Sequence, residues 1–261
     1  MFTLKNFKQT GAAVLLAGVV LLGLTLFASA STLKEVADST YKFYIDGRPG
    51  CSAVAVSETK LATAAHCVAS GTDYSIAVQK LGPNFELISM EIAYTDVIRT
   101  IKDKDVALLE IRDGRLPVFV DVADPAKVDL QFGDPLITVG YPMAIDLTMT
   151  RGEFTGLVPL PNLPSKGGFY KTTIPVTGGN SGGGLYAQTE VRFSTEGGGE
   201  FIQEYELIGL TTAAYQHVSF MSYFSNVNSL DEVLKNLLNT APKYEGAGTE
   251  TGGIVNPADS R

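Results

Sequence analysis

The chain has 261 residues, of which 45% are hydrophobic and 18% are charged, and its formal net charge is −8 at pH 7. This composition is that of an ordinary globular protein, long enough for one large domain or two small ones. The negative charge argues against nucleic acid as a partner, because nucleic-acid-binding surfaces are basic.

Residues 1–30 have the pattern of a secretory signal peptide. Lys5 and Lys8 precede an apolar run over residues 11–27, and Ala28 and Ala30 are the small residues that a signal peptidase reads. The alternative is an uncleaved membrane anchor, since a run of that length can nearly span a bilayer. We therefore expect an exported protein, periplasmic or extracellular, which residues 11–27 anchor to a membrane only if they are not removed.

The region after the signal begins with a short predicted helix, from Leu33 to about Phe43, with Leu33, Val36 and Ala37 on one face. Cys51 and Cys67 follow and are the only two cysteines, so only one intramolecular disulfide is possible. A disulfide that closes a loop of this size would stabilise the fold by about 3 kcal/mol in the chain-entropy model. Two buried free thiols are the alternative, but export favours the disulfide.

The middle of the chain consists of short apolar runs of the β type, separated by turn residues. Examples of the runs are residues 53–56, 74–78, 106–109, 136–139 and 207–210. Many short strands at this spacing indicate barrels or sandwiches. Residues 191–207 look like one long hairpin with three glycines, 197–199, at its tip.

A second helix is predicted near the end of the chain. Ser229 and Glu232 would form a capping box, and apolar residues then recur at helical spacing, namely Leu230, Val233, Leu234, Leu237 and Leu238. Residues 241–261 contain few apolar residues and many Gly, Pro and Thr, and we expect them to be a disordered tail.

Three stretches supply the residue types of a nucleophilic serine system. His66 lies in TAAHC, Asp105 directly precedes the apolar run VALLEI, and Ser181 lies in the glycine-rich stretch GGNSGGG. A serine needs a histidine to accept its proton, and an acid must hold that histidine in the right tautomer. The backbone N–H groups of Gly179 and Ser181 could bind the oxyanion formed in acyl transfer. Asp103 competes with Asp105 for the acid, but Asp105 adjoins the strand.

These stretches resemble the motifs of chymotrypsin-like serine proteases. Residues 63–67 are similar to the histidine motif of that family, 105–109 to its aspartate motif and 179–183 to its serine motif, in the same order along the chain. The cysteine that precedes the one beside His66 also has the family's spacing. Residues 133–157 and 207–212 are similar to the bacterial HtrA-like group, and the resemblance covers roughly residues 40–240.

The resemblance implies an all-β fold of two six-stranded antiparallel β-barrels followed by a C-terminal helix, with the active site between the barrels. The expected organisation is a signal peptide over 1–30, an N-terminal barrel with His66 and Asp105 over 31–130, a C-terminal barrel with Ser181 and the terminal helix over 131–240, and a tail over 241–261. The crossover between the barrels is expected near residues 120–132.

The implied function is that of a secreted serine endopeptidase acting on proteins or peptides, without a cofactor. By resemblance, the specificity pocket is formed by Pro175, Val176, Thr212, Ala213 and Ala214. These residues include no carboxylate, so a substrate Lys or Arg would be buried unpaired. A small or medium uncharged side chain is therefore expected on the acyl side of the cut, with glutamate recognised by His217 as the alternative. No cluster of metal ligands is apparent, so no metal is expected.

Two departures from the family and two alternative functions remain. Asn180 replaces the aspartate with which trypsin-like zymogens bind a new N-terminus, and an amide cannot make that ion pair. No PDZ module is predicted after the second helix. The pattern around Ser181 also matches the nucleophile elbow of α/β-hydrolases. The protein would then be an esterase with His217 as its base. That family has the order Ser, acid, His, but no aspartate lies between Ser181 and His217. A non-catalytic, protease-like binding protein is the other alternative, and the retained triad argues against it.

Overall fold

The computed structural model describes residues 31–82, 87–161, 163, 167–194, 200–214 and 221–238. The expected signal peptide, the tail, the tip of the hairpin and His217 therefore lie outside the described residues. None of the helices in the described ranges is long and apolar enough to cross a membrane.

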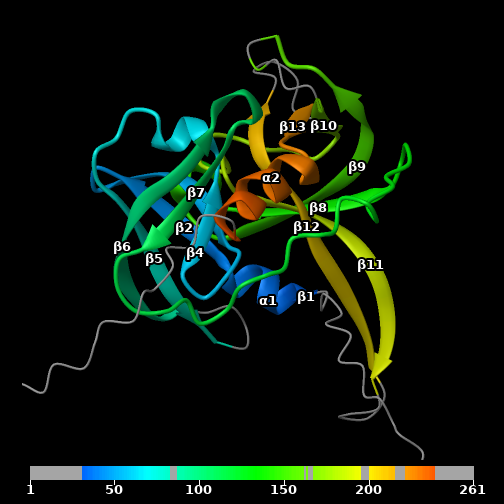
Figure 1. The fold of residues 1–261 in the computed structure, drawn as a ribbon. Helices are drawn as coiled ribbons and strands as arrows, with labels where there is room; N and C mark the ends of the chain where they lie inside the picture. Colours follow the sequence, from blue (N-terminus) through cyan, green and yellow to red (C-terminus); the bar gives the residue numbers. More distant parts are fainter. Residues whose placement is uncertain are drawn as a thin grey trace, which may run out of the picture.

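The first half of the chain forms a closed antiparallel barrel (Figure 1). Its strand order is β2-β3-β4-β7-β6-β5. The bounds are β2 (Thr40–Ile45), β3 (Arg48–Ala55), β4 (Lys60–Thr63), β5 (Tyr74–Leu81), β6 (Leu87–Ile101) and β7 (Val106–Ile111).

The second half forms a second antiparallel barrel, in which β12 and β13 pair to close the sheet. Its strands are β8 (Pro135–Gly140), β9 (Thr148–Val158), β10 (Phe169–Thr172), β11 (Gly184–Ser194), β12 (Glu200–Ala214) and β13 (Ser222–Phe224). A short strand, β1 (Ser31–Thr32), pairs with β12 outside the barrel. The predicted fold of two six-stranded barrels is confirmed. An α/β-hydrolase fold is excluded, because α/β-hydrolases have a mostly parallel sheet and the barrels of this protein are antiparallel.

Period-two alternation along β3 explains how the barrels fit together. Ala53 and Ala55 point into the first barrel, where they pack with Leu61 and Leu109. Val54 points the other way, into a core that both barrels share. The main members of this shared core are Val54, Ala62, Val106, Leu108, Ile137, Val139, Leu207, Leu210 and Leu230.

The two predicted helices form with different bounds. α1 (Leu33–Asp38) ends before residue 43, because the chain from Thr40 onward pairs with both β3 and β5. α2 (Val227–Leu238) begins before Ser229. The Oδ1 atom of Asn226 accepts hydrogen bonds from the backbone N–H and the hydroxyl of Ser229, both at 3.1 Å. Asn226 therefore caps this helix, and the predicted Ser229 capping box is wrong.

The predicted hairpin is confirmed and is longer than expected. β11 and β12 pair from Gly184 with Leu210 out to Ser194 with Glu200, and Figure 1 shows their far ends extending beyond the barrels. Between β7 and β8 the chain passes from one barrel to the other, and Val122 makes an isolated bridge to Leu207 on the way.

Candidate active site

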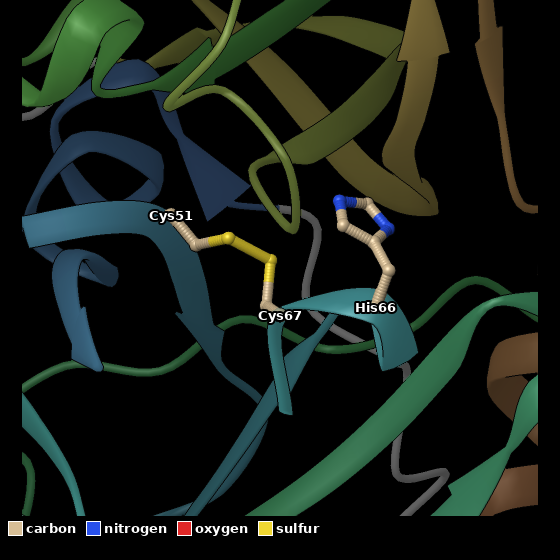
Figure 2. A group of neighbouring side chains, drawn as sticks. All are labelled: Cys51, His66 and Cys67. Atoms are coloured by element: carbon tan, nitrogen blue, oxygen red, sulfur yellow. A yellow bond between two sulfur atoms is a disulfide. The ribbon is translucent and has the colours of Figure 1, made fainter. Parts of the chain in front are cut away.

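Cys51 and Cys67 form the expected disulfide. Cys51 lies in β3, and Cys67 lies in a 3-10 turn, Ala65–Val68, directly after β4. Figure 2 shows the disulfide beside His66, which shares this turn. The sulfur atoms and a ring nitrogen of His66 lie within 4.8 Å of one another. Because the sulfurs are bonded to each other, they are not thiolates and do not act as metal ligands.

The side chain of His66 is held by Asp105. The Nδ1 atom of His66 lies 2.9 Å from Oδ2 and 3.1 Å from Oδ1 of Asp105. The backbone N–H of His66 also donates to Oδ1 at 2.9 Å. An ionised carboxylate only accepts hydrogen bonds, so the proton of the neutral ring lies on Nδ1. The other ring nitrogen, Nε2, then carries a lone pair and can act as a base.

Asp105 owes its position to an unusual backbone conformation. It follows the 3-10 turn Lys102–Lys104 with φ 53° and ψ 44°, in the left-handed region, which Asp tolerates better than most residues. This turn directs the carboxylate inward, where its side chain is only 4% exposed. Asp103, the alternative acid, is exposed. The structure therefore pairs His66 with Asp105.

The interaction with Asp105 changes the acidity of His66. The hydrogen bond to Asp105 raises the pKa of His66 above the usual value, and the negative charge of that carboxylate adds to the effect. Partial burial opposes both by disfavouring the charged ring. The protonated ring, the imidazolium, is thus stabilised. A histidine that accepts a proton during a reaction needs this stabilisation.

Ser181 lies beside this pair, in a loop that we call the serine loop (residues 177–183). Its carbonyl oxygen accepts a hydrogen bond from the backbone N–H of Ser52 at 2.8 Å and lies 3.8 Å from the Sγ atom of Cys67. The chain neighbour of His66 is thereby in contact with Ser181. Among the hydrogen bonds of the described residues, none joins the Ser181 hydroxyl to His66, and such bonds often shorten only when substrate binds.

The glycines of the serine loop are needed for its path. Gly179 has φ +93°, and a Cβ atom there would lie 2.4 Å from the carbonyl oxygen of Tyr141. Gly182 has φ +81°, and its Cβ would lie 2.2 Å from the hydroxyl of Thr63. Within the described residues, neither the N–H of Gly179 nor that of Ser181 has a hydrogen-bond acceptor. Two backbone donors of the serine loop are therefore free to bind an acceptor from outside the described residues.

The residues expected to form the specificity pocket lie on two neighbouring segments. Pro175 is exposed and Val176 is half-buried, whereas Thr212 is buried at the irregular part of the β12–β13 pairing. Ser222, which sequence reasoning missed, joins the two segments. It pairs with Ala214 in the sheet, and its hydroxyl donates to the carbonyl of Ile174 at 2.7 Å.

Comparison with protein families gives one clear match. The model of the trypsin-like peptidase domain matches residues 51–192, a range that contains His66, Asp105 and Ser181. A search of curated proteins found no match.

Solved structures of similar fold include several bacterial proteins. AlgW, an HtrA-type protease with a bound tripeptide, has a TM-score of 0.60 at 20% identity, over 79% of this chain and 62% of that one. An inactive form of Rv3671c from M. tuberculosis has a TM-score of 0.58 at 16% identity, over 82% and 94% of the two chains. The MamO protease domain from Magnetospirillum magneticum has a TM-score of 0.57 at 17% identity, over 77% and 97%. This chain thus spans less than two thirds of the AlgW chain, and such identities show a common fold.

Proposed function

Because the chain belongs to the trypsin-like peptidase domain family, we propose that it is an exported serine endopeptidase with Ser181, His66 and Asp105 as its triad. The observation that carries the proposal is the binding of His66 by Asp105. The carboxylate accepts from both the ring Nδ1 and the backbone N–H of His66, which leaves Nε2 as the base.

The reaction that this site supports proceeds through an acyl-enzyme. His66 Nε2 takes the proton of the Ser181 hydroxyl while Oγ bonds to the scissile carbonyl carbon, whose oxygen becomes an oxyanion. The N–H groups of Gly179 and Ser181 stabilise that oxyanion. The C–N bond then breaks, and the leaving amine receives the proton from His66. Water attacks the ester by the same steps, which releases the acid and restores Ser181.

The substrate class follows from the pocket residues. Of the described residues in the two pocket segments, Pro175, Val176, Thr212, Ala213 and Ala214, none carries a charge, and neither does Ser222 between them. A cationic substrate side chain would lose hydration there without gaining a partner. We therefore infer cleavage after small or medium uncharged residues. Glutamate recognition by His217 is the competing specificity.

The decisive test compares the wild type with Ser181→Ala. The wild type should hydrolyse casein and react with a fluorophosphonate, and the variant should do neither while keeping its thermal unfolding temperature. Parallel assays with peptide and ester substrates separate a peptidase from an esterase. A wild type that is not labelled would support a binding protein instead, and hydrolysis of casein by the variant at the wild-type rate would refute Ser181 as nucleophile.

A further inference from the structure

Ser52 is a buried serine of the first barrel whose polar groups reach into the second. Its side chain is fully buried and lies on the same side of β3 as Val54, which packs against Val139 in the shared core. Thr63 donates its hydroxyl to the Ser52 carbonyl at 2.7 Å. The backbone of Ser52 is thus also bound by a side chain of the neighbouring strand β4.

The hydroxyl of Ser52 makes two hydrogen bonds, both to backbone groups of the second barrel. It donates to the carbonyl oxygen of Gly179 at 2.8 Å and accepts from the N–H of Tyr141 at 2.9 Å. The backbone N–H of Ser52 in addition donates to the carbonyl of Ser181. Ser52 therefore holds the carbonyl groups of both residues whose N–H groups would bind the oxyanion.

The hydrogen bond between the Tyr141 N–H and Ser52 also affects the peptide group that joins Gly178 to Gly179. Tyr141 begins a tight turn, residues 141–145, in which Met143 and Ala144 have φ values of 52° and 57°. The N–H of Met143 donates to the carbonyl oxygen of Gly178 at 2.5 Å. A trans peptide group is planar, with its N–H opposite its C=O, so this bond directs the N–H of Gly179 away from the turn.

Gly179 is consequently held on both sides. Met143 fixes the peptide group before it, Ser52 fixes the one after it, and Ser52 also holds the turn that contains Met143. In trypsin-like zymogens an ion pair with a new N-terminus performs this task, but Asn180 has no charge to offer. We propose that Ser52 is a positioning residue whose hydroxyl maintains the serine loop in the conformation that binds the oxyanion. This inference rests on the proposed function.

The test is Ser52→Ala, assayed with a peptide substrate. We expect kcat to fall about 10- to 100-fold, somewhat less than the loss of a whole oxyanion donor, while KM changes by less than about twofold because ground-state contacts remain. A peptide aldehyde forms a hemiacetal with Ser181 whose oxygen occupies the oxyanion site, so its affinity should fall by the same factor as kcat/KM. The acid limb of the pH profile should stay in place, because the His66–Asp105 pair is untouched.

Ser39→Ala is the matched control. Ser39 is also fully buried, and its hydroxyl also donates to a backbone carbonyl, that of Val36 at 3.0 Å, but it does not touch the serine loop. Rates are expressed per site labelled by fluorophosphonate, so that misfolded protein does not count. If Ser52→Ala does not fold, Ser52→Thr and Ser52→Val replace it in the test. Thr and Val have the same shape, and only Thr keeps the hydroxyl, so kcat should be about tenfold higher for the Thr variant.

The possible failures are distinguishable. Equal kcat and equal aldehyde affinity for Ser52→Ala and the wild type would overturn this inference alone, as would an equal loss in Ser39→Ala or equal rates for the Thr and Val variants. A wild type that neither reacts with fluorophosphonate nor binds the aldehyde would overturn the proposed function and this inference with it.

Discussion

The acid that orients His66 can be identified by comparing variants of Asp105 and Asp103. Asp105→Asn should lower kcat by about four orders of magnitude, because the amide would favour the wrong tautomer of the ring. Asp103→Asn is the control and should have activity within about twofold of the wild type, since Asp103 is exposed. Steady-state rates of the two variants decide between them, and a large loss in the Asp103 variant would contradict the assignment.

The protonation state of His66 sets the pH dependence of activity. Only the neutral ring can accept the serine proton, so kcat/KM should rise as pH increases through the pKa of His66. Since Asp105 raises that pKa, the acid limb should have its midpoint above about 6.5, the value of an unperturbed histidine. A pH profile with a constant ionic strength measures it. A midpoint below that of an unperturbed histidine would mean that burial outweighs the carboxylate.

At the scale of single elements, the cap of α2 gives a stability test. Asn226→Ala removes the acceptor for Ser229 and also the donor to the carbonyls of Gly167 and Gly168, at 2.9 and 2.6 Å. The loss of a cap costs about 1 kcal/mol, and the loss of the hydrogen bonds to these two carbonyls, which are not buried, adds about 0.5–1.5 kcal/mol. Ser229→Ala, the control, should cost much less. Urea unfolding of both in the Ser181→Ala background measures the difference, and a greater loss for Ser229→Ala would restore the capping box.

The link between β3 and the turn carrying His66 gives a second test at this scale. The two cysteines are 16 residues apart in the sequence. Replacing Cys51 and Cys67 together by Ala should therefore lower the free energy of unfolding by about 3 kcal/mol, the value for a loop of this size. Urea unfolding again serves as the measurement. Treatment of the wild type with a reductant should give a similar shift, and no shift in the double variant would contradict a stabilising role.

The fold could be predicted from the sequence where the pattern is local, and could not where it depends on distant contacts. TAAHC and GGNSGGG can each be recognised from a few adjacent residues, and β-type runs predict strands because alternation is a local property. Ser52 could not be found in this way, since its hydroxyl partner Gly179 is 127 residues away and nothing in the composition of β3 predicts a hydrogen bond across barrels. The end of α1 was missed for the same reason: pairing with β3 and β5 overrides the local helical pattern of residues 39–43.

At the scale of the whole molecule, Ser31, the first residue that the structure describes, is held in the sheet of the second barrel. Ser31 pairs with Tyr205 on β12, and Asn180 cannot bind an amine as an ion pair. A protein that starts at Ser31 and one with an additional N-terminal tag should therefore have the same kcat/KM within about twofold. Strong dependence on a free Ser31 amine would contradict this expectation.

Cleavage specificity is also a property of the assembled molecule, because the pocket combines segments before and after the nucleophile. Digestion of a denatured proteome, followed by mass spectrometry of the new termini, should give cuts mainly after small or medium uncharged residues. Cuts mainly after Lys or Arg would refute the apolar pocket. Cuts after Glu that disappear in His217→Ala would establish the competing specificity.

The shared core has a consequence for the autonomy of the two barrels. Val54 and Leu108 from the first barrel pack with Val139 and Leu207 from the second in one buried cluster, so either barrel alone would expose half of that cluster to water. Two fragments separated by a single cut between β7 and β8 should therefore remain associated and reconstitute hydrolysis when mixed, whereas each fragment alone should aggregate. Catalysis would then report directly on fragment complementation.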